Sequence, residues 1–221
     1  MKNLLAWLSH LLFPPKCILC RKVLESGELD LCSTCRATAP DHPQGKLKLP
    51  FIDSVAAVWY YRGNVRESLL RYKFRRARFL AEPFGRMLAM KVLSSGVEEL
   101  DLVTWVPISP MRKLRRGYDQ DELLAKVVAR ELNLPCMPVL RKIRNNRPQA
   151  QIESQAMRRA NVMGVYRCVD PQAMPGARIL LVDDILTTGA TAEECARTLR
   201  EAGAKEVHCA VVASAHHNNP K

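Results

Sequence analysis

ILLVDDILTTGAT, residues 179–191, is the stretch of this sequence that decides the fold. Its first four residues are uninterrupted and apolar, as expected of a central strand that helices cover on both faces. The strand ends in two carboxylates, Asp183 and Asp184, at the edge where open α/β sheets place their ligands. The loop that follows, 187–191, opens directly into a helix. Its backbone N–H groups, its hydroxyls and the positive end of that helix can together surround a phosphate.

Two details of this loop sharpen the expectation. Gly189 allows the backbone to approach a ligand closely, and the spacing Thr191-x-x-Glu194 is that of a capping box, which predicts a helix beginning at Thr191. The chain has neither GxxxxGK[ST] nor GxGxxG, so a P-loop and a dinucleotide fingerprint are excluded. Acids that can bind a diol, beside a loop that can bind a phosphate, point to a ribose 5-phosphate moiety. The alternative is an ordinary strand, turn and helix with a polar loop.

Strand and helix patterns alternate on both sides of this stretch. The predicted strands are 52–60, 102–106, one beginning at 139–140, and 207–213; the predicted helices are 65–72, 80–93, 119–132 and 191–202. Residues 141–160 are polar and basic and have no apolar period. Alternation of this kind predicts an α/β fold with a parallel sheet.

Length and charge set broad limits on the function. The chain has 221 residues, enough for one ordinary domain or a domain with a small appendage, and Lys plus Arg exceed Asp plus Glu by 34 to 22, a formal charge of +12. The excess is concentrated in 73–78, 112–116, 141–147 and 158–159. Such runs suit phosphorylated ligands or nucleic acid, or form a solvated basic face. Few aromatic residues lie among them, so stacking on nucleic-acid bases is poorly supported.

Four of the eight cysteines form two pairs near the start of the chain. Cys17 and Cys20 form one CxxC, and Cys32 and Cys35 form the other, eleven residues later. Two such knuckles supply four thiolates for a closed tetrahedral Zn²⁺ site, in which the metal is structural. Redox-active CxxC pairs and an iron centre are the alternatives. The other four cysteines stand alone in apolar surroundings, so a reducing compartment, and hence a cytoplasmic protein, fits best.

The first thirteen residues are rich in apolar side chains, which have the spacing of one helical face. The run is too short to span a membrane, and no small-residue cleavage site follows it. We therefore expect an amphipathic helix packed on the protein, with docking to a membrane or a partner as the alternative. Together with the cysteines it forms the first predicted unit, 1–50, a helix plus a zinc knuckle. The second predicted unit is 51–221.

The 179–191 stretch resembles the motif with which type I phosphoribosyltransferases bind 5-phosphoribosyl 1-pyrophosphate (PRPP). The resemblance implies that Asp183 and Asp184 bind the ribose 2′ and 3′ hydroxyls. It assigns the 5-phosphate to the loop residues Thr187, Thr188, Gly189, Ala190 and Thr191. Mg²⁺ normally arrives with the pyrophosphate. Residues 103–109 resemble the strand and pyrophosphate loop, and 141–160 occupy the place of the flexible loop that closes over the ligands.

Over nearly its whole length the chain resembles the ComF/GntX family. The residues that carry this resemblance are the four paired cysteines, Tyr72-Lys73-Phe74, Val106-Pro107, Arg112, Arg115–Gln120, Arg158, Asn161, Gly164, Tyr166 and the 179–191 stretch. Asp119 stands where the family usually has Asn, and Glu153 where an apolar residue is common. The resemblance implies a type I phosphoribosyltransferase-like parallel sheet flanked by helices over 51–221. It also implies a role in DNA uptake or in the use of external DNA.

Three kinds of function remain open at this stage. The first is an enzyme that transfers phosphoribosyl from PRPP to an unidentified acceptor, with Ser109, Arg112 and Arg116 as candidates for holding pyrophosphate. The second is a non-catalytic module that senses PRPP or accompanies DNA. The third is a zinc-knuckle protein whose basic face docks on single-stranded DNA or on a DNA-translocation partner. No general base can be named from the sequence, because the acceptor is unknown.

Overall fold

The computed structural model describes residues 14–45, 47–97, 99–146, 152 and 154–215. The helix predicted for residues 1–13 lies outside them, as do Glu153 and part of the basic stretch 141–160. Among the described residues, no helix is long and apolar enough to cross a membrane.

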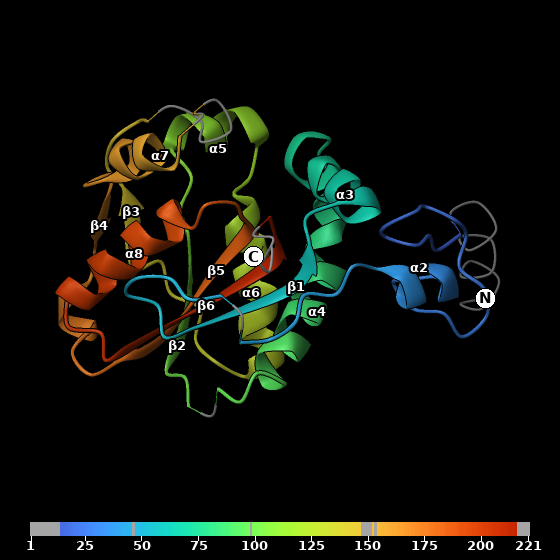
Figure 1. Ribbon diagram of the computed structural model, residues 1–221, viewed down its shortest axis with the longest axis horizontal. Helices are drawn as coiled ribbons and strands as arrows, with labels where there is room; N and C mark the ends of the chain where they lie inside the picture. The colour runs from blue at the N-terminus through green and yellow to red at the C-terminus, as the bar shows by residue number, and fades with distance from the viewer. Residues whose placement is uncertain (1–13, 46, 98, 147–151, 153, 216–221) are drawn as a thin grey trace, which may run out of the picture.

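The centre of the molecule is a four-stranded sheet (Figure 1). Its strands are β1 (Ser54–Tyr60), β2 (Leu102–Trp105), β5 (Arg178–Leu186) and β6 (Glu206–Ser214). Their order is β1-β6-β5-β2 and every pair is parallel, which confirms the predicted α/β class. Strand β5 extends beyond the predicted 179–182, because its ladder with β6 continues past the two aspartates as far as Leu186 opposite Ser214.

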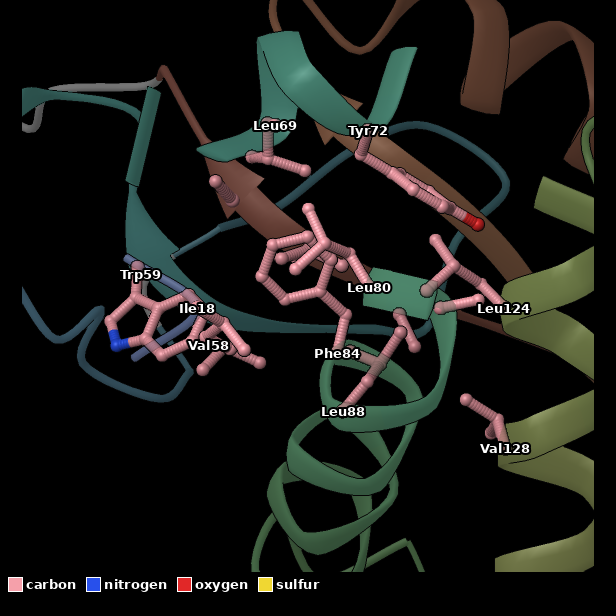
Figure 2. Packing of buried hydrophobic residues seen from close by; sticks show 14 of the residues in the cluster. Ile18, Val58, Trp59, Leu69, Tyr72, Leu80, Phe84, Leu88, Leu124 and Val128 are labelled. Atoms are coloured by element: carbon pink, nitrogen blue, oxygen red, sulfur yellow. The ribbon is translucent and has the colours of Figure 1, made fainter. Parts of the chain in front are cut away.

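Helices cover both faces of the sheet, because side chains of β5 alternate between them. On one face Leu180 and Val182 pack with α4 (Ala81–Leu93) and α6 (Gln120–Leu132). On the other face Ile179 and Leu181 pack with α8 (Ala190–Glu201). Helix α3 (Gly63–Phe74) follows β1 and contributes Leu69 and Tyr72 to the first cluster, where Figure 2 shows them near Leu80 and Phe84.

The remaining elements are short. They are α2 (Ser33–Thr38), α5 (Pro110–Arg116), β3 (Leu140–Lys142), α7 (Gln155–Val162), β4 (Tyr166–Cys168) and the 3₁₀ turns Arg78–Leu80 and Pro171–Ala173. Strands β3 and β4 form a separate antiparallel pair. The basic stretch 141–160 therefore begins in a strand and ends in a helix, although its sequence has no apolar period.

The predicted capping box at Thr191 is wrong. Helix α8 begins one residue earlier, at Ala190, after Gly189 in a left-handed conformation with φ 81°. The Glu194 carboxylate accepts hydrogen bonds from the Gly164 N–H at 2.6 Å and from Arg197. It is therefore used to hold the segment before β4 against α8, and the start of α8 has no side-chain cap.

The cysteine-containing segment packs on the start of the larger unit. The Ile18 carbonyl accepts hydrogen bonds from Ser68 Oγ and from Arg71, both on α3. Arg86 on α4 donates to both carboxylate oxygens of Asp30 at 2.8 Å. Ile18 is buried beside Val58 and Trp59 of β1, as Figure 2 shows. The chain thus has a continuous core across residue 50, and the division 1–50 and 51–221 stays a prediction.

Candidate functional site

The site is built around the two acids of β5. Because the strand alternates, Asp184 points to the face that α6 covers, where it is 2% exposed, and Asp183 points to the other face. Lys73, in the last turn of α3, places its Nζ 2.9 Å from Asp184 Oδ1. Burial opposes the charge on Lys73, but the two carboxylates outweigh it and raise the pKa of Lys73. This ion pair joins α3 to the end of β5.

A third carboxylate lies beside this pair. Asp121, in the first turn of α6, is 2% exposed, and carboxylate oxygens of Asp121, Asp183 and Asp184 lie within 4.8 Å of one another. Burial and repulsion from Asp184 raise the pKa of Asp183 to about 7, and the same two causes raise that of Asp121 well above its usual value. Among the described residues, Lys73 is the one cation that forms an ion pair with this group. The cluster therefore favours bound protons or an added cation.

The loop after β5 turns sharply into α8. A side chain at Gly189 would meet Leu49 Cδ2 at 2.6 Å, and φ at this position is positive, so only glycine fits without strain. The first intrahelical bond of α8 runs from the Glu193 N–H to the Gly189 carbonyl, at 2.8 Å. The N–H groups that precede Glu193 in the first turn have no partner within the helix and carry its positive end. Thr187 is exposed and Thr188 and Thr191 are half-buried, so their hydroxyls lie at the rim of the same turn.

The neighbouring strand β2 supplies the second loop of the site. Trp105 is paired with Val182, so β2 ends beside the acids of β5. Ser109 Oγ accepts a hydrogen bond from the Arg112 N–H at 3.4 Å and caps α5. Asp119 caps α6, and its other carboxylate oxygen accepts from the Ile108 N–H at 3.2 Å. Because Asp119 acts here only as an acceptor, the departure from the family's usual Asn leaves the loop supported.

The predicted pyrophosphate residues are partly brought together. Ser109 and Arg112 lie at the start of α5, and Arg112 donates to the Asn146 carbonyl at 3.3 Å. Arg116 lies one turn further on and donates to Gln120 Oε1 at 2.7 Å, with its guanidinium 5.2 Å from the Phe74 ring centre. Ser109 and Arg112 therefore border the β2 loop directly, while Arg116 contacts the end of α3.

Several residues of the site were not predicted from the sequence. Lys142 of β3 and Tyr166 of β4 face each other, with Nζ 5.4 Å from the ring centre. Burial and the neighbouring Arg112 lower the pKa of Lys142 to about 8. No carboxylate of the described residues forms an ion pair with Lys142. Nothing in a basic run distinguishes the lysine that becomes buried. The order of strands and helices could have placed Asp121 near the sheet edge, since it lies in the first turn of α6, the second helix after β2.

The four paired cysteines form a second centre. Their Sγ atoms all lie within 4.8 Å of one another, and Cys20 Sγ is 3.6 Å from Cys32 Sγ. A tetrahedral zinc ion with Zn–S bonds of about 2.3 Å needs sulfurs about 3.8 Å apart, so this donor set fits zinc. Burial raises the pKa of Cys17, but backbone N–H groups from Leu19, Cys20 and Cys32 outweigh it and lower that pKa to about 7. The first knuckle is thus prepared to present a thiolate.

Comparison with known proteins agrees with both centres. A model described as "Phosphoribosyl transferase domain" matches residues 122–221, and one described as "Double zinc ribbon domain" matches residues 8–45. Competence protein F of Haemophilus influenzae is 26% identical over 215 residues, which cover 87% of this chain and 93% of that protein. DNA utilization protein YhgH of Escherichia coli K12 is 29% identical over 218 residues, covering 88% and 94%.

Two further matches are looser. Competence protein ComFC of Bacillus subtilis is 27% identical over 150 residues, covering 66% of this chain and 58% of that protein. Among solved structures, adenine phosphoribosyltransferase of Leishmania tarentolae superposes with a TM-score of 0.41 at 15% identity, covering 73% and 77%, which is too distant to argue from.

The sheet, the acid-bearing strand and the Thr/Gly turn define a phosphoribosyltransferase-like domain, preceded by a zinc ribbon whose four cysteines support a structural metal. Within that class the chain is similar over most of its length to competence and DNA utilization proteins, a similarity that supports the ComF family.

Proposed function

We propose that the chain binds PRPP with Mg²⁺ at the carboxyl edge of β5 and β2. The observation that carries the proposal is the end of β5, where a carboxylate pair held by Lys73 is followed at once by Gly189 and the start of α8. Asp183 and Asp184 would accept hydrogen bonds from the ribose hydroxyls. The N–H groups and hydroxyls of residues 187–191 would bind the 5-phosphate.

Pyrophosphate is the part of PRPP that needs most positive charge. Ser109 and Arg112 border the loop after β2, and Arg116 lies one turn along the same helix. Lys142 adds a buried cation that has no carboxylate partner among the described residues and lies close enough to Arg112 for their charges to interact. Mg²⁺, when bound, would neutralise pyrophosphate oxygens and assist their departure.

Closure over the ligands falls to the segment between β3 and β4. It carries Asn146, whose carbonyl accepts from Arg112, and α7, whose Arg159 pairs with Glu193 of α8 at 3.1 Å. These contacts tie the segment to α5 and α8, the helices that follow the two loops of the site. Exclusion of water by this segment would favour a transition state with positive charge on the ribose.

The cellular role follows from the relatives' names. Proteins named for competence and for DNA utilization align over most of this chain. We propose that the chain supports DNA uptake or the use of external DNA from the cytoplasm, with single-stranded DNA or a DNA-translocation partner nearby. Transfer of phosphoribosyl to an unidentified acceptor is the reaction that the site could support. A non-catalytic PRPP-sensing or DNA-associated module is the alternative.

Calorimetric titration with PRPP and Mg²⁺ tests the binding. We expect the double variant Asp183→Asn/Asp184→Asn to lose measurable PRPP affinity. Asp41→Asn, which changes an exposed aspartate remote in sequence from these two, should bind PRPP as the wild type does. Unchanged PRPP affinity in the double variant would contradict the proposal. Pyrophosphate release with a panel of bases and amines then separates the two roles, because turnover indicates a transferase and binding without turnover indicates a module.

A further inference from the structure

A second concentration of positive charge lies beside the proposed PRPP site. A pocket of about 160 Å³ opens between the end of α3 and the end of α5. Its lining consists of Lys73, Phe74, Arg76, Arg115, Arg116 and Tyr118. Four of these six residues are cations and none is an acid. The composition favours an anionic ligand.

The two walls of this pocket are fixed to each other. Tyr118 Oη donates to the Tyr72 carbonyl at 2.6 Å, and Arg78 donates to the Gly117 carbonyl at 3.4 Å while its guanidinium lies 4.7 Å from the Tyr118 ring centre. Arg116 stacks on Phe74 across the pocket. These contacts hold cations from two segments near one another, so the arrangement is prepared before any ligand arrives.

The backbone of Arg76 is held in an unfavourable conformation. Its φ is 54°, in the left-handed region that glycine and asparagine occupy more readily than arginine. An ion pair does not explain why arginine occupies this position, because among the described residues neither Arg76 nor Arg115 forms one. Strained residues of this kind gather at ligand sites, where the side chain that the strain presents has a use. Here it presents a guanidinium to the pocket.

Phosphate is the anion that this lining fits best. Guanidinium groups donate two parallel N–H bonds to phosphate oxygens, and Arg76, Arg115 and Arg116 converge from two sides. Phe74 is 62% exposed, so it leaves an apolar ring at the mouth for the group that the phosphate esterifies. Lys73 belongs both to this lining and to the ion pair with Asp184, so the pocket adjoins the acids.

We propose that the pocket of Lys73, Phe74, Arg76, Arg115, Arg116 and Tyr118 binds the phosphate of a second ligand, a phosphate monoester, next to the proposed PRPP site. The position across Lys73 from Asp184 would suit an acceptor that carries a phosphate. That last role rests on the proposed function, whereas the binding itself does not.

Phenyl phosphate, titrated calorimetrically, is the probe. The background variant is Thr187→Val/Thr188→Val, which weakens phosphate binding at the 187–191 loop. The pocket variant adds Arg76→Gly, which relieves the left-handed strain, and Arg115→Ser. The matched control adds Arg66→Ser and Arg141→Ser instead, since both are exposed arginines without ion pairs among the described residues and the change in net charge is the same.

We expect the pocket variant to bind phenyl phosphate about tenfold more weakly than the background, and the control to differ by less than about twofold. Equal phenyl phosphate affinity in the pocket variant and the background would overturn the proposal. Complete loss of phenyl phosphate binding already in the Thr187→Val/Thr188→Val background would also overturn it. Inorganic phosphate bound as tightly as the ester would assign the pocket to the free ion. A thymidine oligonucleotide without a terminal phosphate is the last probe. If it bound in an Arg76- and Arg115-dependent way while phenyl phosphate did not bind, the surface would be a polynucleotide site and the proposal would be overturned.

The two proposals fail separately. Asp183→Asn alone, which keeps the ion pair between Lys73 and Asp184, should weaken PRPP binding and leave phenyl phosphate binding unchanged. Arg76→Gly/Arg115→Ser should leave PRPP binding measurable. A wild-type protein that binds phenyl phosphate through Arg76 and Arg115 but does not bind PRPP would contradict the proposed function alone. A wild-type protein that binds PRPP, and whose phenyl phosphate affinity does not depend on Arg76 and Arg115, would contradict the pocket alone.

Discussion

Asp183 is the residue in which function and stability are most directly opposed. An unfolded aspartate ionises near pH 3.9, whereas burial and Asp184 raise the pKa of Asp183 to about 7 in the fold. Between these values the folded chain holds a proton that the unfolded chain has released. Stability from this group is therefore lost as the pH rises from about 4 to about 7. A ligand that donates hydroxyl protons, or a cation, would offset the loss.

We expect Asp183→Asn to raise the stability of the ligand-free protein by about 2 kcal/mol at pH 8, with the gain shrinking toward pH 4. The measurement is urea unfolding of both proteins at several pH values. Asp184→Asn is the contrasting variant, because it leaves Lys73 without its partner and should destabilise at pH 8. A wild-type protein that is more stable than Asp183→Asn at pH 8 would contradict the inferred charge state.

At the scale of elements, α4 and α6 cross at a short distance, which sets the packing of the hydrophobic cluster on their face of the sheet. A Cβ on Gly85 would lie 2.5 Å from Val127 Cβ, well inside contact distance. The helices approach this closely because α4 has a glycine where they cross, so any larger residue must push them apart. The same crossing buries Phe84 and Leu124 fully, and it holds α6, which carries Asp121 in its first turn, against the sheet.

Gly85→Ala should therefore destabilise the protein by about 2 kcal/mol, although alanine is the better helix former. Val127→Ala in the same chain removes Cγ1, the second Val127 atom that would lie 2.5 Å from the new Cβ, but keeps Cβ, so the double variant should recover only part of the loss. Urea unfolding of the two single variants and the double variant gives the coupling. Strictly additive losses would show that the overlap at this crossing is not what limits residue 85.

The elements also show how far sequence reasoning can reach. The end of β5, its two acids and the glycine turn are contiguous, so local pattern alone was enough to place them. Lys73 and Asp121 reach the same acids from α3 and α6, and only the tertiary fold brings those ends together. The capping box failed for a related reason, because Glu194 is bound by Gly164, a partner remote in sequence. Long-range contacts decided what local pattern could not.

At the scale of the whole molecule, α3 contacts both the zinc ribbon and the acids of the phosphoribosyltransferase-like domain. Figure 1 shows α2 and its loops lying beyond β1 and α3, on the side of the molecule away from α8. The ribbon carbonyls of Ile18 and Leu19 accept hydrogen bonds from Arg71. Two residues further along α3, Lys73 holds Asp184. One helix thus has the zinc ribbon at one contact and the proposed ribose site at another.

Loss of the metal should consequently be felt in the ligand site. Cys32→Ser, or chelation of zinc, would release the loop that positions Ile18, expose apolar surface shared with Trp59 and Leu69, and leave α3 less well fixed. We expect a lower Tm for the main unfolding transition and PRPP affinity reduced by about three- to tenfold, a coupling of the size seen between linked sites. Calorimetry of the zinc-loaded and zinc-free protein measures both.

The coupling through α3 has its own control. Lys73→Met removes the contact that carries it, so in that background zinc removal should still lower the Tm but should no longer change the remaining PRPP affinity. Ser33→Ala, on the exposed side of α2, should leave both quantities close to those of the wild type. If zinc removal weakened PRPP binding equally with and without Lys73, the ribbon would act on the site by a route other than α3. The zinc ribbon would then stabilise the fold without positioning the acids through this helix.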